Sequence, residues 1–177
     1  MRHCFFKFLV ILGLFVSVTF NAAQALEIKD VRFGVHPDKT RMVLELSEKT
    51  DFRAFMLPRD ATTPYRLVID MPSFQWQAGA VKAPKTEVLD VRSGTLNPQT
   101  KRIVVDLGKP AQIKDVFVLP RSNSAPDRLV IDFKIISTAQ FETAERPAFG
   151  TLPEEQAEQN LTSLIESQTG DQAEGGI

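Results

Sequence analysis

The chain has 177 residues, and its 21 basic and 22 acidic side chains give a formal net charge of −1 at pH 7. This balance excludes the strongly basic surface of a typical nucleic-acid-binding protein, so we expect no nucleic-acid partner. The one cysteine, Cys4, lies in an N-terminal segment that we expect to be removed, which excludes disulfides and thiolate chemistry from the mature chain.

Residues 1–25 have the order of a secretory signal peptide. Arg2 and Lys7 precede an apolar run over residues 8–20, and the small-residue pattern Ala23-Gln24-Ala25 follows. The run is shorter than the roughly 20 residues that a helix needs to cross a bilayer, so we expect cleavage rather than a permanent membrane span. This predicts a mature chain that starts near Leu26 and functions in the periplasm.

The mature chain contains an internal repeat with a spacing of about sixty residues. Both copies contain the same three landmarks in the same order: Asp-Val-Arg at 30–32 and 90–92, Phe-x-Leu-Pro-Arg at 55–59 and 117–121, and Arg-Leu-Val-Ile-Asp at 66–70 and 128–132. Three matched landmarks in one order indicate a duplication.

Each copy predicts four β-strands, because apolar and β-branched residues alternate with polar ones between Gly, Pro, Asp and Asn. Met42, Leu44 and Leu46, for example, share one face of their run. We expect strands near residues 27–36, 39–47, 51–57, 65–71, 87–95, 100–107, 111–119 and 127–133. A sheet with one apolar face needs a second layer, so we predict an all-β fold, a β-sandwich of two related antiparallel sheets of about four strands, as one domain over residues 26–136.

Residues 137–177 are predicted to form an acidic tail or linker. From Thr151 onward the sequence has six acidic residues and no Lys or Arg, as in disordered segments. Residues 151–154 have the chemistry of a helix cap, but a solvated tail is the preferred interpretation. Without residues 1–25 and 151–177, the remaining body carries 19 basic against 16 acidic residues, which allows a weak attraction to an anionic polymer.

The mature chain lacks the residues of the common hydrolase sites, so we expect no catalytic residue, metal or cofactor. Its one histidine, His36, lies beside Pro37 in a predicted turn, and zinc hydrolases commonly need three ligands from His, Glu or Cys. The duplicated Asp70 and Asp132 could form a carboxylate pair that shares one proton, as in aspartic proteases. Neither aspartate starts an Asp-Thr-Gly or Asp-Ser-Gly loop, so we set this interpretation aside.

Arginines recur at matching outward positions of the two copies. One interpretation is structural, with same-face ion pairs between Arg66 and Asp70 and between Arg128 and Asp132. The other is functional, because an arginine fork binds carboxylates well and the stem peptides of peptidoglycan present carboxylates. The candidate peptidoglycan-binding arginines are Arg32, Arg41, Arg66, Arg92, Arg102 and Arg128.

Two aromatic residues, Phe74 and Trp76, lie in the connector between the copies. Aromatic faces are common partners for sugar rings, so Trp76 is also a candidate peptidoglycan-binding residue. A connector aromatic that plugs the open end of a sandwich is the preferred interpretation.

These features together resemble the AMIN domain, which precedes the catalytic domain of bacterial N-acetylmuramoyl-L-alanine amidases. The resemblance covers roughly residues 27–135 and depends on the Asp-Val-Arg strand, on Thr-Arg-Met-Val-Leu-Glu-Leu, on the Phe-x-Leu strand and on Arg-Leu-Val-Ile-Asp-Met-Pro. It implies a β-sandwich of two symmetric sheets that holds a periplasmic cell-wall amidase at the division site by binding peptidoglycan.

The resemblance leaves three functions open. The first is a non-catalytic peptidoglycan-binding module that targets amidase activity during cell division and has a cell-wall amidase or other envelope proteins as partners. The second is the N-terminal part of an amidase, because in those enzymes a polar linker leads to a zinc-dependent domain, whereas here the sequence ends at Ile177 within such a linker. The third is an interaction module of a pilus secretin system.

Overall fold

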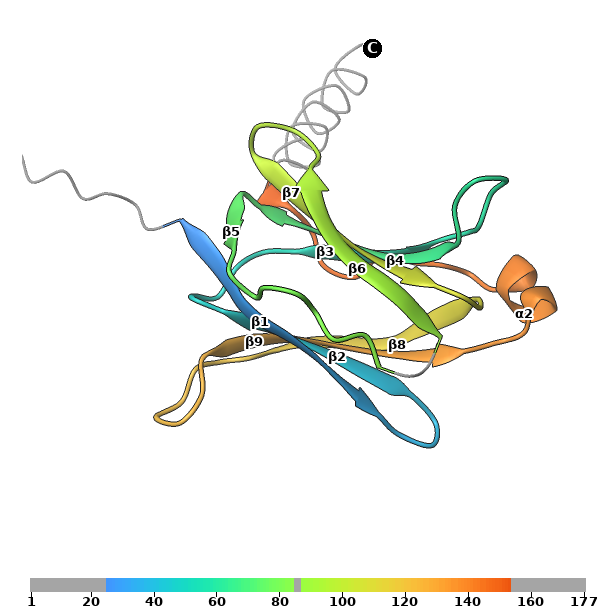
Figure 1. The fold of residues 1–177 in the computed structure, drawn as a ribbon, viewed down its shortest axis with the longest axis horizontal. Helices are drawn as coiled ribbons and strands as arrows, with labels where there is room; N and C mark the ends of the chain where they lie inside the picture. Colours follow the sequence, from blue (N-terminus) through green and yellow to red (C-terminus); the bar gives the residue numbers. More distant parts are fainter. Residues whose placement is uncertain (1–24, 85–86, 154–177) are drawn as a thin grey trace, which may run out of the picture.

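The computed structural model describes residues 25–84 and 87–153; the expected signal peptide, apart from Ala25, and residues 154–177 of the expected tail lie outside them. Within these residues, nine strands and one short helix form two stacked sheets (Figure 1). The prediction of an all-β sandwich is therefore confirmed. No helix among these residues is long and apolar enough to cross a membrane.

The strands follow the predicted segments closely. The five-stranded sheet has the order β5-β1-β2-β9-β8, with β5 (Phe74–Trp76), β1 (Leu26–Val35), β2 (Thr40–Leu46), β9 (Asp127–Ile135) and β8 (Ala111–Leu119). The four-stranded sheet has the order β3-β4-β7-β6, with β3 (Arg53–Leu57), β4 (Tyr65–Pro72), β7 (Thr100–Leu107) and β6 (Val88–Thr95).

Each sheet contains two strands from each copy of the repeat. In the five-stranded sheet, β2 of the first copy pairs with β9 of the second, and in the four-stranded sheet β4 pairs with β7. The order β1-β2-β9-β8 in one sheet therefore matches β6-β7-β4-β3 in the other, with the two copies exchanged. Because the central pairing of both sheets joins the copies, neither copy forms a sheet of its own and the pair folds as one domain.

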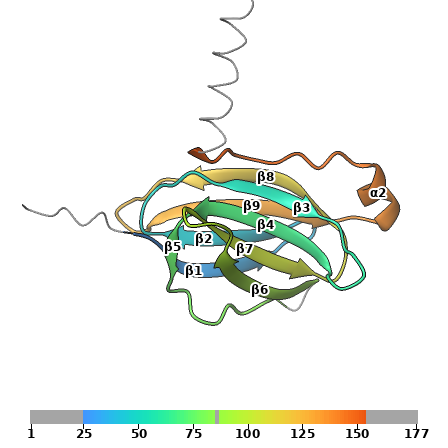
Figure 2. The same ribbon diagram turned by 90° about the horizontal axis from the view of Figure 1, so that it is seen from above.

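The core lies between the two sheets and is built by the alternation of the strands (Figure 2). Met42, Leu44 and Leu46 of β2 are fully buried, as predicted, and so are Ile103 and Leu107 at matching positions of β7. The intervening side chains point away from the core, which gives each sheet an outer face where charged and apolar residues are mixed.

The sandwich departs from symmetry at the edge of the five-stranded sheet. There β5, which follows β4 directly, pairs in parallel with β1, so this sheet is not purely antiparallel. Phe74 of β5 is 2% exposed and belongs to the core. In the described part of the chain, no strand pairs with the equivalent edge, the outer edge of β6.

The folded domain extends past residue 136, the boundary that the sequence predicts. Ser137 caps the short helix α2 (Thr138–Thr143) with a capping box, and Phe141 of this helix packs edge to face on Tyr65 with 5.1 Å between ring centroids. Phe149 then pairs with Ala54 of the edge strand β3. The chain thus runs from α2 back along the β3 and β8 side of the sandwich (Figure 2). The packing of this segment could not be predicted from its sequence, because its few apolar residues are widely spaced in a polar stretch.

Gly150 is the residue that allows this segment to lie against β3. Its φ angle is +78°, and a Cβ atom at this position would collide with the carbonyl oxygen of Phe52. Glycine avoids both the strain and the collision, so residue 150 has a backbone requirement that other residues cannot meet.

Candidate functional site

The outer faces of the two sheets present the same arrangement of side chains in three rows that run across the strands. On the four-stranded sheet the rows are Gly94, Arg102, Asp70 and Arg53; Arg92, Val104, Val68 and Phe55; and Asp90, Asp106, Arg66 and Leu57. On the five-stranded sheet they are Gly34, Arg41, Asp132 and Asp115; Arg32, Val43, Val130 and Phe117; and Asp30, Glu45, Arg128 and Leu119.

An arginine–aspartate pair lies at the centre of the first row on each face. Nε and Nη2 of Arg102 donate to the two carboxylate oxygens of Asp70 at 2.6 and 2.8 Å. Arg41 donates to Asp132 in the same way at 2.7 and 2.8 Å. The Asp70 and Asp132 side chains are 3% and 4% exposed, while those of Arg102 and Arg41 are 30% and 36% exposed. Each aspartate therefore fixes an arginine whose outer side remains open to solvent.

These pairs correct the ion pairs expected from the sequence, which joined Arg66 to Asp70 and Arg128 to Asp132. Residues four apart in a strand are separated by about 13 Å, whereas residues opposite each other on neighbouring strands are about 5 Å apart. The registers place Arg102 opposite Asp70 and Arg41 opposite Asp132, so the cross-strand pairs form instead. Each pair joins the two copies of the repeat.

Hydrogen bonding in these pairs favours the ionised forms of Asp132, Arg41 and Arg102. The hydrogen bonds from Arg41, supported by Lys39 at 2.7 Å, lower the pKa of Asp132 to about 2. The hydrogen bonds to Asp132 and Asp70 also raise the pKa values of Arg41 and Arg102. The Arg41–Asp132 pair is consequently ionised throughout the neutral range.

The arginines of the second row are the most exposed of the six candidates. The side chains of Arg32 and Arg92 are 57% and 50% exposed. Arg92 donates two hydrogen bonds of 3.1 Å to Asp106, and Arg32 pairs with Glu45 and, at 3.4 Å, with Asp30. These two arginines are therefore neutralised locally but remain accessible.

The arginines of the third row are the least suited to bind a ligand. Arg66 contacts the Pro58 carbonyl oxygen at 3.3 Å and Asp60 at 3.4 Å. The Nε atoms of both Arg66 and Arg128 are buried without a hydrogen-bond partner in the described part of the chain. Their guanidinium groups are therefore partly covered by the sheet surface.

Aromatic residues that are absent from the predicted site complete both faces. The Arg41 guanidinium lies 5.5 Å from the Phe117 ring centroid, and the guanidinium groups of Arg102 and Arg53 lie 5.7 and 5.2 Å from the ring centroid of Phe55. These distances allow cation–π attraction. Phe55 and Phe117 occupy equivalent, outward-facing positions of their strands, and this alternation is a signal that the sequence contains. The Phe-x-Leu pattern was interpreted only as a landmark of the repeat.

Trp76 does not join these arginines. It lies on β5 opposite Ile28, packs against the core and donates a hydrogen bond from Nε1 to the Gly79 carbonyl oxygen at 3.1 Å. Phe74, its neighbour in β5, contacts it at 6.5 Å between ring centroids. This arrangement favours the plug interpretation over a sugar-binding surface.

Asp70 and Asp132 do not come together as a carboxylate dyad. Asp70 lies on the outer face of the four-stranded sheet and Asp132 on the outer face of the five-stranded sheet. Each aspartate has its own arginine, so no proton is shared between the two carboxylates. The proton-sharing geometry of an aspartic protease is therefore not formed by these residues.

His36 lies in the turn between β1 and β2, where its backbone N–H donates to the Lys39 carbonyl oxygen at 2.9 Å. Its side chain is exposed, as expected for a turn residue. Among residues 25–84 and 87–153, no group of three or more His, Cys, Asp or Glu side chains is arranged to hold a metal ion.

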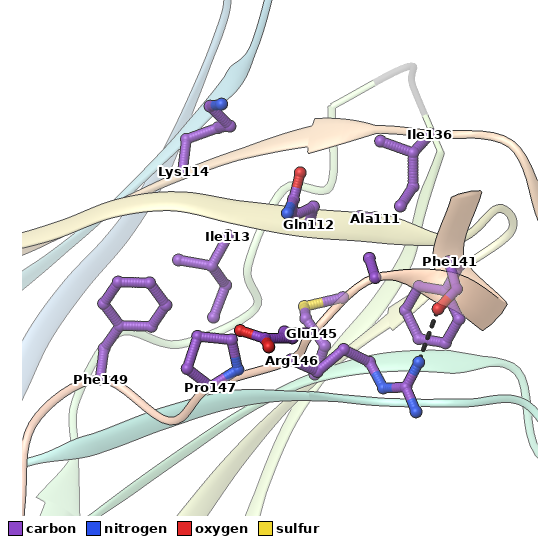
Figure 3. A pocket seen from close by; sticks show the side chains of 12 residues that line it. Ala111, Gln112, Ile113, Lys114, Ile136, Phe141, Glu145, Arg146, Pro147 and Phe149 are labelled. Carbon is purple, nitrogen blue, oxygen red and sulfur yellow. Dashed lines mark hydrogen bonds between the residues drawn. The ribbon is translucent and has the colours of Figure 1, made fainter.

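A separate pocket of about 260 Å³ lies between β8 and the segment after α2 (Figure 3). Its wall is largely apolar, with Met56, Ile113 and Phe149 among its residues, and Gln112 and Glu145 lie at its side. This volume is slightly below the usual range for small-molecule sites, roughly 300–1,000 Å³. The duplicated outer faces carry more specific chemistry, so they are the stronger candidate site.

No protein-family model matches this chain, and no curated protein matches it either.

Proposed function

We propose that this protein is a non-catalytic, periplasmic peptidoglycan-binding module that resembles the AMIN domain and targets cell-wall amidase activity. The observation that carries the proposal is the repetition of one arrangement, an arginine fixed by a buried aspartate beside a phenylalanine, on both outer faces of the sandwich. A repeating polymer suits a protein with two like faces, because each face can engage a similar unit.

The fixed arginines are the natural points of contact with stem-peptide carboxylates. A guanidinium group has five N–H donors, and the aspartate uses Nε and one hydrogen of Nη2. The Nη1 group of Arg102 makes no hydrogen bond within the described residues, and the same holds for Arg41. The aspartate orients the arginine in advance, so a ligand carboxylate need not order a flexible side chain.

The surface charge of these faces explains why the affinity should be modest. The four candidate arginines of the first two rows already have carboxylate partners. A ligand carboxylate must therefore compete with an existing ion pair or bind beside it. Exposed ion pairs contribute about 0–1 kcal/mol each. Useful retention on the wall would thus arise from simultaneous contact of both faces with neighbouring strands of polymer.

Co-sedimentation with purified peptidoglycan sacculi tests the proposal. We expect the mature protein to sediment with sacculi at low salt and to be released as salt rises, because screening acts over about 10 Å at 0.1 M ionic strength. Arg32→Gln and Arg92→Gln, at the two most exposed arginines, should each reduce binding, and the double variant should reduce it further. Trp76→Phe serves as the control, since Trp76 packs on the core away from both faces.

Absence of sedimentation by the folded protein would reject the proposal. Binding that is insensitive to salt and to both arginine substitutions, but is lost in Trp76→Phe, would replace carboxylate recognition with sugar stacking.

A further inference from the structure

A groove lies along the edge of the five-stranded sheet, between β1 and the connector that follows β5. The connector runs past β1 on its way to β6 (Figure 2). The groove has a volume of about 430 Å³, which falls within the usual range for small-molecule sites, roughly 300–1,000 Å³. It is lined by four residues of β1 and two of the connector: Asp30, Val31, Arg32, Phe33, Ala80 and Lys82.

Part of this lining is apolar and includes an aromatic residue. Phe33 lies opposite Met42 of β2 and packs against the core, but it is only partly buried and also lines the groove. Val31, two residues earlier, is 5% exposed and belongs to the core. An aromatic ring held in place by the core provides a surface against which the apolar face of a sugar ring can pack.

The polar part of the lining contains donors and acceptors side by side. Arg32 pairs with Glu45 and, at 3.4 Å, with Asp30. Asp30 in turn accepts a hydrogen bond of 2.9 Å from the backbone N–H of Val31, which fixes its carboxylate. Lys82 is exposed on the other side of the groove. This mixture suits hydroxyl groups, which both donate and accept, better than it suits a ligand group of one charge.

The duplication provides a matched place that lacks the aromatic residue. Asp-Val-Arg at 90–92 repeats residues 30–32, but the residue that follows in β6 is Ser93, at the position equivalent to Phe33. The chain after β4 forms β5 and the connector, whereas the chain after β9 forms α2 and then pairs with β3. Arg92 is therefore the counterpart of Arg32 without an aromatic neighbour in sequence.

We infer that this groove is a saccharide-binding site that takes a neutral sugar unit of the glycan strand, with the ring against Phe33 and hydroxyl groups on Asp30, Arg32 and Lys82. The inference rests on the proposed function, because it gives the glycan strand of the same polymer a place separate from the fixed arginines. Hydroxyl groups donate to the carboxylate and accept from the guanidinium and ammonium groups. Since the ligand is uncharged, salt should have little effect on this contact.

A titration with chitotetraose, followed by NMR, tests the site with a probe that has sugar rings and no carboxylate. We expect the backbone amide signals of residues 30–33 and 80–82 to shift, with an affinity that changes less than about twofold between about 0.05 and about 0.5 M salt. Phe33→Leu, which keeps an apolar side chain against the core, should weaken binding about fivefold. Arg32→Gln should weaken it about threefold, whereas Arg92→Gln, the matched control, should leave it unchanged.

A second kind of variant narrows the groove without touching the core. Ala80 is exposed and lines the groove, so Ala80→Leu should lower the affinity for chitotetraose about threefold or more by occupying the space of the sugar. Ala83→Leu, on the same connector but outside the groove, is the control. Melting temperatures equal to that of the wild type show that the losses come from the groove and not from unfolding.

The outcomes point to different errors. A protein that sediments with sacculi but does not bind chitotetraose overturns the saccharide site and leaves the proposed function standing. Chitotetraose binding that is unchanged in Phe33→Leu, Arg32→Gln and Ala80→Leu overturns the placement of the site in this groove. Failure of the wild-type protein to sediment with sacculi rejects the proposed function and, with it, the glycan strand as the ligand.

Discussion

The outer faces of the two sheets share their buried chemistry and differ in their exposed chemistry. Both keep a bidentate arginine–aspartate pair, with the aspartate 3% or 4% exposed, and both bury a valine, Val68 or Val130, to 1% beneath the charged rows. They differ at the edge strands, where the four-stranded sheet has Arg53 and the five-stranded sheet has Asp115.

Each outer face therefore has a shared part, the buried arginine–aspartate pair, and a part that differs, the edge residue. The buried pairs join strands that come from different copies of the repeat, and both copies contribute to both pairs. The edge residues at equivalent positions, Arg53 and Asp115, carry opposite charges. The arginine–aspartate pairs are thus common to both faces, and the edge residues are where the two faces differ in charge.

The largest expected effect comes from removing a buried aspartate. Asp70→Ala should lower the free energy of unfolding by about 3 kcal/mol, because it leaves the guanidinium group of Arg102 without the buried carboxylate that accepts its two hydrogen bonds. Asp132→Ala should cost less, since the carboxylate of Asp115 still attracts Arg41. Urea unfolding measures both values, and Asp115→Ala is the exposed control. A larger loss from Asp132→Ala would contradict this ranking, which depends on the attraction between Asp115 and Arg41.

The next effect concerns the C-terminal segment, which covers β3 of the four-stranded sheet. Gly150→Ala should destabilise by about 2 kcal/mol, because the left-handed backbone angle disfavours alanine and its Cβ would collide with the Phe52 carbonyl oxygen. Gly94→Ala is the control, since a methyl group at residue 94 would meet no atom within 4 Å and its φ is ordinary. Thermal unfolding compares the two, and equal melting temperatures would show that residues 149–152 do not pack as described.

Acid should weaken the five-stranded sheet through Asp132. Its folded-state pKa is lowered from the ordinary 3.8 to about 2, so its ionised form stabilises the fold above about pH 4. This contribution, about 2 kcal/mol, is lost progressively as the pH falls from about 4 to about 2. Asp132→Asn should remove this part of the pH dependence from urea unfolding measured between about pH 5 and about pH 2. An unchanged acid profile in this variant would show that other carboxylates dominate.

The smallest effect on stability should accompany a change in binding. Gly94 and Gly34 lie at the open end of the first row, opposite Arg102 and Arg41. A Cβ atom fits at both positions, since at residue 94 it meets no atom within 4 Å and at residue 34 it lies 3.5 Å from His36 Nε2, so stability should change by about 0.5 kcal/mol or less. The side chain would nevertheless crowd the neighbouring arginine. Gly94→Leu and Gly34→Leu should therefore each lower sacculus binding about twofold; unchanged binding in both variants would contradict contact of the polymer with these arginines.

Much of the fold could be predicted from the sequence, because alternation and repetition are local signals. The run around Met42, Leu44 and Leu46 predicts which side chains are buried, and the two copies of Arg-Leu-Val-Ile-Asp predict two equivalent strands. The exchange of strands between copies could not be predicted, since alternation shows which face of a strand is buried but not which strand lies beside it.

The same limit explains what was missed in the site. Arg66 and Asp70 share a strand face, but only the register shows that Asp70 lies opposite Arg102 and Arg53. Arg53 and Phe55 were not predicted as site residues, because their neighbours on the outer face of the sheet lie on strands that are distant in the sequence. The packing of Phe141 and Phe149 was hidden for a related reason, since isolated aromatic residues in a polar segment carry no period.

The most direct test of carboxylate recognition by the outer faces is to map a soluble disaccharide–tetrapeptide fragment of peptidoglycan onto the protein by NMR. The account predicts amide shifts that cluster around the two fixed arginines, Arg41 and Arg102, on the outer faces of the sheets. Shifts that cluster instead around Trp76, or in the pocket beside Phe149, would contradict it.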